Sequence, residues 1–196
     1  MRIRSFVLTA TLAALAAAPA AAVEDGINDV RGIIGFWPEN YEVDGEEVGV
    51  DSAIRLAGQY MKSHGGELGD AGGLIYGGEG SFTIASGDDI DSTALVVDGH
   101  IGYGYQLPNM PAFHFEGTAF LGLGLEQVDA DGNDDIGPLI EYGIRAAGFY
   151  TFDNSWQLGL DLRYLIESSS SQDLGGGDFD YENNGLAVLF AFGKRM

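Results

Sequence analysis

The sequence predicts an all-β fold in which eight antiparallel strands follow one another up and down and close into a barrel. Two observations predict this fold. Apolar and polar residues alternate along segments of about nine residues or more, and this period of two is typical of a β-strand. Clusters of Gly, Asp, Asn, Pro and Ser separate the segments, as expected where a chain turns between neighbouring strands.

The clearest alternation lies in the segment Leu139–Ile166, which predicts two strands joined by a turn at Phe152–Asn154. One face of the second strand is apolar and holds Trp156, Leu158, Leu160, Leu162, Tyr164 and Ile166. The opposite face of the two strands mixes small residues with Glu141, Arg145, Asp161 and Arg163. An apolar face backed by a charged face is typical of a transmembrane barrel strand, with lipid outside and a polar interior.

Six further strands are expected at about Val30–Val43, Val48–Lys62, Leu74–Ala85, Thr93–Gln106, Ala112–Val128 and Gly185–Gly193. Each is long enough to cross a bilayer when tilted. In the third of the eight strands, Phe82 is expected on the outer face with Leu74, Tyr76 and Ile84. The Ser-, Gly- and Asp-rich stretch Ser168–Asn184 is expected to be a long, mobile outer loop.

The first 22 residues predict a secretory signal peptide, so the barrel domain is expected at residues 23–196. Arg2 and Arg4 precede the apolar run Phe6–Ala18, and Ala20-Ala21-Ala22 offers small residues for cleavage after Ala22. The alternative is an uncleaved anchor, but the apolar run is short for a spanning helix.

Composition excludes two kinds of chemistry. The chain has no cysteine, so it can form neither disulfides nor thiolate sites. Its formal charge of −21 becomes −23 once the two leader arginines are removed, and such a chain repels nucleic-acid phosphates. We therefore expect no nucleic-acid partner.

The acidic residues fall on alternate linkers, which supports the order of the strands. With eight strands, both ends of an exported chain lie on the periplasmic side. The three periplasmic linkers then hold only Glu67, Asp70 and Asp153, whereas the outer linkers hold many acids. The outer end is therefore expected to present acidic loops.

Several short segments resemble the family of small eight-stranded outer-membrane β-barrels, of which the membrane domain of outer-membrane protein A is the familiar member. They are Gly148-Phe149-Tyr150, Asn154-Ser155-Trp156, Leu162-Arg163-Tyr164 and the terminal Phe190-Ala191-Phe192. The resemblance spans essentially all of Val30–Gly193. It implies a porin-like barrel in the outer membrane of a Gram-negative envelope, surrounded by outer-membrane lipid and lipopolysaccharide.

Two patterns with metal or catalytic chemistry are better explained by structure alone. Asp129–Asp135 alternates oxygen ligands as a calcium loop does, but Asp134 and Ile140 stand where an EF-hand needs Gly and Glu. Divalent cations are expected to bind several acidic loops together and not this single segment. Asp98 near His100, and Glu116 near His114, place a carboxylate beside a histidine on the same face, as in a general base. No serine nucleophile stands beside either pair. Hydrogen-bonded interior histidines are expected, with no catalytic residue, no cofactor and no defined metal site.

The inward charges form the expected functional set. Because single buried charges are costly, we expect them to pair with one another and to fill the narrow interior. The set comprises Arg31, Glu39, Asp51, Arg55, Glu79, Asp98, Glu116, Glu141, Arg145, Asp161 and Arg163.

The register of the hairpin follows from keeping its charges on one face. That condition requires a loop with an odd number of residues. A three-residue loop Phe152–Asn154, with Asn154 in the left-handed conformation, places Arg145 opposite Asp161 and Tyr150 opposite Trp156. The register that opposes Arg145 to Arg163 brings two like charges together and is disfavoured.

Three functions fit these patterns. The first is a non-enzymatic, monomeric outer-membrane barrel with a plugged interior, which stabilises the envelope and presents acidic loops. The second is a narrow pore that prefers cations, given the interior excess of acids. The third is a soluble exported barrel that binds a small apolar ligand, and it requires an apolar interior. No protein partner is identified.

Overall fold

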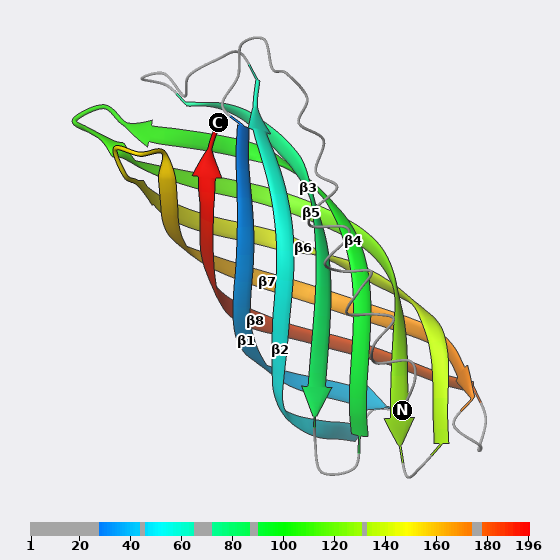
Figure 1. The fold of residues 1–196 in the computed structure, drawn as a ribbon. Helices are drawn as coiled ribbons and strands as arrows, with labels where there is room; N and C mark the ends of the chain where they lie inside the picture. Colours follow the sequence, from blue (N-terminus) through cyan, green and yellow to red (C-terminus); the bar gives the residue numbers. More distant parts are fainter. Residues whose placement is uncertain (1–27, 44–45, 65–71, 87–89, 131–132, 174–177) are drawn as a thin grey trace.

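The computed structural model is a closed barrel of eight antiparallel strands, so the predicted fold class is confirmed (Figure 1). It describes residues 28–43, 46–64, 72–86, 90–130, 133–173 and 178–196, and the side chains among them except those at 37–52, 90, 130, 133–134, 170–173 and 178–182. The strands are β1 (Asn28–Val43), β2 (Glu46–Ser63), β3 (Gly73–Ser86), β4 (Ile90–Leu107), β5 (Met110–Ala130), β6 (Asn133–Thr151), β7 (Trp156–Asp173) and β8 (Asp178–Arg195). The expected signal peptide lies outside the described residues. Within the described part there is no α-helix long and apolar enough to cross a membrane.

The first and last strands close the barrel. Asp29 near the start of β1 pairs with Arg195 at the end of β8. This end of the barrel, which also holds the β2–β3, β4–β5 and β6–β7 connections, is called here the termini end. The opposite end, with the other four connections, is called the far end.

The strands are strongly tilted, because the register climbs as it passes round the barrel. Starting at Arg31, we can step from each residue to its cross-strand partner on the next strand. After one full turn of the barrel, these steps return to β1 at Tyr41, ten residues further along the strand. Ten residues of rise over eight strand spacings correspond to a tilt of about 40°. A barrel of this size has an interior just wide enough to be filled by its own side chains.

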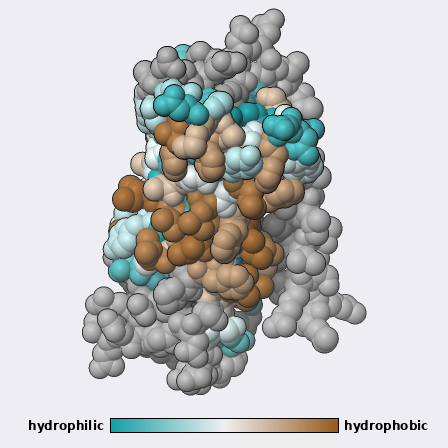
Figure 2. Space-filling view, turned by 90° about the vertical axis from the view of Figure 1, so that its left-hand side faces the viewer, coloured by the Kyte–Doolittle hydropathy of each residue, from teal (hydrophilic) through white to brown (hydrophobic). Residues whose placement is uncertain are grey.

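The two faces of the strands differ as the alternation predicts. The outward side chains are apolar and exposed, with Val97 68% and Leu123 67% accessible. Figure 2 shows such side chains gathered across the middle of one face, with hydrophilic residues toward the upper rim. Phe82 differs from the other outward residues, since only 9% of it is exposed between its cross-strand partners Leu56 and Leu95.

The predicted register of β6 and β7 is wrong by two residues along β7, because the loop lies one residue further along the chain than predicted. Phe152 and Trp156 close the turn through a 2.8 Å backbone hydrogen bond, so the three-residue loop is 153–155. The Ser155 amide donates to the Phe152 carbonyl, and Ser155 takes the left-handed conformation, at φ 67°, that was expected of Asn154. Asn154 instead accepts a hydrogen bond from the Trp156 amide.

The observed register opposes Arg145 to Arg163, the arrangement expected to be disfavoured. Tyr150 consequently faces Leu158, and Trp156 stacks on Phe192 of β8 instead of facing Tyr150. The odd loop length was predicted correctly, because parity keeps the charges inside. The like charges are tolerated because carboxylates from β3, β5 and β7 surround them.

The expected long loop at Ser168–Asn184 is also wrong. β7 continues to Asp173 and β8 starts at Asp178, with a register irregularity between Ser169 and Gln172. The composition of this stretch indicated a loop, but cross-strand pairing extends the hairpin beyond the apolar part of its strands. Residues 174–177 lie outside the described part.

Candidate functional site: the interior charge network

The interior is lined by charged side chains at full burial. Of the eleven residues expected there, the side chains of Glu39 and Asp51 lie outside the described residues. The other nine are each at most 6% exposed: Arg31, Arg55, Glu79, Asp98, Glu116, Glu141, Arg145, Asp161 and Arg163. They come from seven strands, β1 to β7, so the network joins opposite walls of the barrel.

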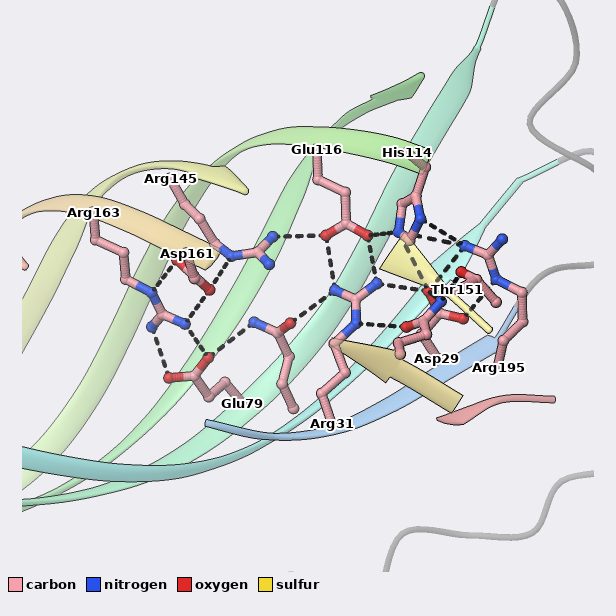
Figure 3. Close-up of polar contacts among 12 residues, drawn as sticks. Asp29, Arg31, Glu79, His114, Glu116, Arg145, Thr151, Asp161, Arg163 and Arg195 are labelled. Carbon is pink, nitrogen blue, oxygen red and sulfur yellow. Dashed lines mark hydrogen bonds and ion pairs between the residues drawn. The ribbon is translucent and has the colours of Figure 1, made fainter. Parts of the chain in front are cut away.

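Arg31 anchors the termini end of the network (Figure 3). Its two terminal nitrogens donate to both oxygens of Glu116, at 2.8 and 2.5 Å, and one of them also donates to Asp29 at 2.6 Å. Its guanidinium lies 3.8 Å from the centre of the Phe149 ring. A planar fork that binds a carboxylate in two places and stacks on a ring is fixed in position, which lysine could not reproduce.

Asp161 joins the two arginines that face each other across β6 and β7. It accepts from Arg145 Nε at 2.6 Å and from Arg163 Nε and Nη2 at 3.0 Å each. Arg145 also donates to Glu116 at 2.8 Å, and Arg163 donates to both oxygens of Glu79 at 2.7 Å. Every arginine of this group therefore contacts two carboxylates.

Arg55 is the centre of a second group nearer the far end. It binds both oxygens of Glu141, at 2.6 and 2.8 Å, and lies 3.2 Å from Asp98 and 3.5 Å from Glu79. The cross-strand partner of Glu141 on β7 is Glu167, and the Glu141 carboxylate binds Arg55 of β2 across the barrel.

Several interior residues were absent from the expected set. Two glutamines bridge the charges: Gln59 accepts from Arg31 and donates to Glu79, and Gln157 accepts from Arg31 and donates to Asp29. Asp29, Glu126, Glu167, Asn183, Gln59 and Gln157 are all buried. Strand parity places Glu126 and Glu167 on the inner face, whereas Asp29 precedes Val30, the predicted start of the first strand.

The two interior histidines differ. His114 lies 3.2 Å from Glu116 and 3.3 Å from Arg195, as expected of a hydrogen-bonded residue. His100 stacks on Phe120, and neither of its ring nitrogens has a hydrogen-bond partner in the described structure. Its nearest carboxylate is Glu79 at 3.9 Å, so the expected pairing with Asp98 does not form.

Among the described residues, one group of three His, Asp or Glu side chains lies close enough together to hold a metal ion. It consists of Asp29, His114 and Glu116. The two carboxylates, however, already bind Arg31, and Asp29 also binds Arg195 at 3.1 Å. A cation here would have to displace two arginines. The arrangement is therefore suited to closing the mouth of the barrel more than to binding a metal.

Small residues make room for the large charged groups. A Cβ at Gly159 would meet the ring of Phe149, and a Cβ at Gly122 would meet the carboxylate of Asp98. Glycine at these places lets a ring and a carboxylate lie flat against the wall.

No protein-family model matches the sequence, and no curated protein matches it. Similar solved structures include Ail, the attachment invasion locus protein of Yersinia pestis, at 14% identity and a TM-score of 0.45, covering 88% of this chain and 100% of that one. Neisserial surface protein A is 13% identical with a TM-score of 0.45, and the match covers 85% of this chain and 98% of that one. The outer membrane protein OprG from Pseudomonas aeruginosa is 15% identical with a TM-score of 0.45, and the match covers 88% of this chain and 97% of that one. No ligand or activity can be transferred at this level of similarity, and the fold is established by the strand pairing of this chain.

Proposed function

We propose that this protein is a non-enzymatic outer-membrane barrel whose interior is plugged by its own charge network. The observation that carries the proposal is the inversion of the usual soluble pattern. Arginines and carboxylates are buried inside, while leucine, isoleucine, valine and aromatic side chains cover the outside. Only a surrounding lipid makes that arrangement favourable, since water would hydrate the charges and exclude the apolar face.

The height of the apolar surface supports this location. Along β5 the outward residues run from Phe113 to Leu125 without a charged side chain. Twelve residues at about 3.3 Å each, tilted by about 40°, span about 30 Å, which matches the hydrocarbon core of a bilayer. At the termini end, Phe113, Tyr150 and Phe152 pack edge to face, and Trp156 stacks on Phe192. Such aromatic residues are typical of the membrane interface.

The same features weigh against the other two functions. A soluble barrel that binds an apolar ligand needs an apolar interior, and here the interior holds ion pairs. An open pore needs a continuous aqueous path, and here Arg31, Glu116, Arg145 and Asp161 bind one another across the lumen. The protein's expected surroundings are outer-membrane lipid and lipopolysaccharide, with the chain acting as a monomer that stabilises the envelope.

Site-directed spin labelling tests the proposal, and the absence of native cysteine makes each label unique. Cysteine is introduced in place of Leu123 on the apolar wall, and separately in place of the exposed turn residue Asp153, in protein reconstituted in lipid vesicles. The label at position 123 should be relaxed strongly by oxygen and weakly by a water-soluble nickel chelate, and the label at 153 should show the reverse. Equal access of the nickel chelate to both positions would show that the apolar wall faces water.

A further inference from the structure

We propose that the outer wall at the termini end binds the headgroup of an anionic phospholipid. The site lies where β7, β8, β1, β2 and β3 follow one another round the barrel. It consists of Tyr60, Lys62, Tyr76, Trp156 and Lys194, called here the seam patch. The proposal rests on the proposed membrane location and deepens it, because it names one class of lipid and one place on the barrel.

The lysine and arginine side chains are divided between the two faces of the barrel. Beyond Arg4, these residues are Arg31, Arg55, Lys62, Arg145, Arg163, Lys194 and Arg195. The five arginines point inward, where each forms an ion pair with a carboxylate. The two lysines point outward, since their chain neighbours Met61, Ser63 and Gly193 are buried. They are therefore the only lysines or arginines on the outer wall.

Both lysines lie at the termini end, on either side of β1. Lys62 pairs with Asn28, and Lys194 pairs with Val30. Two strand spacings across the sheet and two residues along it place their Cα atoms about 12 Å apart. Tyr60 also pairs with Val30, and its hydroxyl donates to Asn28 at 2.9 Å. Each lysine carries its charge on a flexible four-carbon stem, so both ammonium groups can approach the same headgroup.

Neither lysine is neutralised by the protein. Among the described residues, no carboxylate forms a salt bridge with Lys62 or Lys194, although the chain as a whole is strongly acidic. The exposed acids Asp91 and Asp129 pair with each other at the far end. At the termini end, the described surface holds one exposed acid, Asp153, against the two lysines. This end is therefore suited to an anionic ligand.

The apolar side chains that adjoin the lysines indicate a lipid and not a free anion. Trp156 pairs with Lys194, is 40% exposed and stacks on Phe192, with 4.8 Å between the ring centroids. Tyr76, which is 39% exposed, pairs with Lys62. Lysine and aromatic residues at the edge of an apolar wall lie at the depth of lipid headgroups. A phospholipid can bind the lysines through its phosphate while its acyl chains cover the wall, which free phosphate cannot do.

A hollow beside Lys194 gives the headgroup a place on the rim. It is lined by Phe152, Asp153, Asn154, Trp156 and Phe192. The aromatic side chains suit the glycerol backbone and the start of the acyl chains. The Asp153 carboxylate can accept a hydrogen bond from a headgroup hydroxyl. Phosphatidylglycerol, which has one negative charge and a headgroup with hydroxyls, is therefore the appropriate probe.

Quenching of Trp156 by brominated lipid tests the proposal, because this tryptophan lies next to Lys194. Trp37 is replaced with phenylalanine, so that Trp156 is the single tryptophan of the chain. The protein is reconstituted in vesicles that mix phosphatidylglycerol with phosphatidylcholine, with bromine on the acyl chains of one lipid or of the other. The two quenching series together give the binding of phosphatidylglycerol relative to phosphatidylcholine beside Trp156. We expect a ratio of at least about five, since one lysine near a membrane surface contributes about that factor.

Substitution of the lysines separates the seam patch from the net charge of the protein. Lys62→Gln/Lys194→Gln should bring the ratio to within about twofold of one, and Lys62→Arg/Lys194→Arg should keep the wild-type ratio. The single variant Lys194→Gln should lower the ratio at least about twofold. Its control is Asn109→Asp, which changes the net charge by the same amount on the exposed β4–β5 turn of the same end and should leave the ratio unchanged.

Three results would overturn the proposal: a ratio near one in the protein with both lysines, a ratio that persists in the double glutamine variant, or an equal loss in Asn109→Asp and Lys194→Gln. Each of these leaves the membrane location intact, because Trp156 is still quenched by lipid. Absence of quenching by either lipid would overturn the membrane location as well, so the failure of the two proposals is distinguishable.

Discussion

Replacing Asp161 with alanine tests whether the charge network stabilises the barrel. Asp161 is fully buried and accepts three hydrogen bonds, one from Arg145 and two from Arg163. In Asp161→Ala the two arginines face each other across β6 and β7 with no carboxylate between them. Arg145 keeps Glu116 and Arg163 keeps Glu79, so neither arginine loses every partner.

The expected loss of stability is about 3 kcal/mol. Three hydrogen bonds between charged groups are worth about 4.5 to 9 kcal/mol if they are lost without compensation. Breaking one buried ion pair typically costs about 3 to 5 kcal/mol, and the retained carboxylates place this variant at the lower end of that range. Equilibrium unfolding in urea, with the protein folded into lipid vesicles and followed by tryptophan fluorescence, measures the difference.

A second variant separates the loss of the ion pair from the loss of packing. Arg145→Met/Asp161→Ala removes both charges and leaves the Arg163 to Glu79 and Arg31 to Glu116 pairs in place. It should recover about 2 kcal/mol relative to the sum of the two single variants, since an apolar pair can replace a buried ion pair at little cost. A loss below about 1 kcal/mol for Asp161→Ala, together with additive effects in the double variant, would refute a stabilising role for the network.

Three further predictions concern closure, packing and the turn. A closed barrel keeps its strand hydrogen bonds in mild SDS, so unboiled and boiled samples should migrate differently on a gel, and equal mobility would contradict closure. Gly159→Ala should destabilise the barrel by about 1 to 3 kcal/mol, because its methyl group meets the Phe149 ring, whereas Gly117→Ala, with open space around its Cβ, should change stability by under about 0.5 kcal/mol. Ser155→Gly should stabilise the protein by about 0.5 to 1 kcal/mol by relieving the left-handed conformation, and Ser155→Val should destabilise it. Urea unfolding measures the stability of all four variants. A Gly117→Ala variant less stable than Gly159→Ala would contradict the packing argument at Gly159, and a Ser155→Val variant more stable than Ser155→Gly would contradict the backbone argument at Ser155.

The number of strands and the direction of each face were predictable from the sequence, because alternation depends only on neighbouring residues. Ile54 and Leu56 on β2 are exposed, while Arg55 between them is buried. Keeping the β6 and β7 charges on one face requires a loop with an odd number of residues, and the observed loop has three residues. Parity is a local property, so it survives errors in the assigned ends of the strands.

The register was not predictable in the same way, because it depends on contacts with other strands. Opposing Arg145 to Arg163 is unfavourable within an isolated hairpin. In the closed barrel, Glu116 from β5 and Glu79 from β3 offset the repulsion. The turn itself offered only a weak preference, since Asn154 and Ser155 can each occupy the left-handed position.

Partners across the lumen were beyond sequence reasoning for a related reason. Parity places Arg31 and Glu116 on the inner face, but their relative height depends on the ten-residue climb of the register round the barrel. The same holds for Arg55 and Glu141. The length of the last hairpin was missed because Ser, Gly and Asp residues have low strand propensity, and pairing along β7 and β8 overrides that preference.

Planar-bilayer recording of the purified wild-type protein tests most directly whether the lumen is closed. Arg31, Glu116, Arg145 and Asp161 bind one another across the barrel, and the proposed plug leaves no aqueous path past them. The membrane should therefore show no sustained single-channel current after insertion, with insertion itself verified by protection of the strands from added protease. A stable, cation-selective conductance from the inserted wild-type protein would contradict a plugged interior and identify the barrel as a pore.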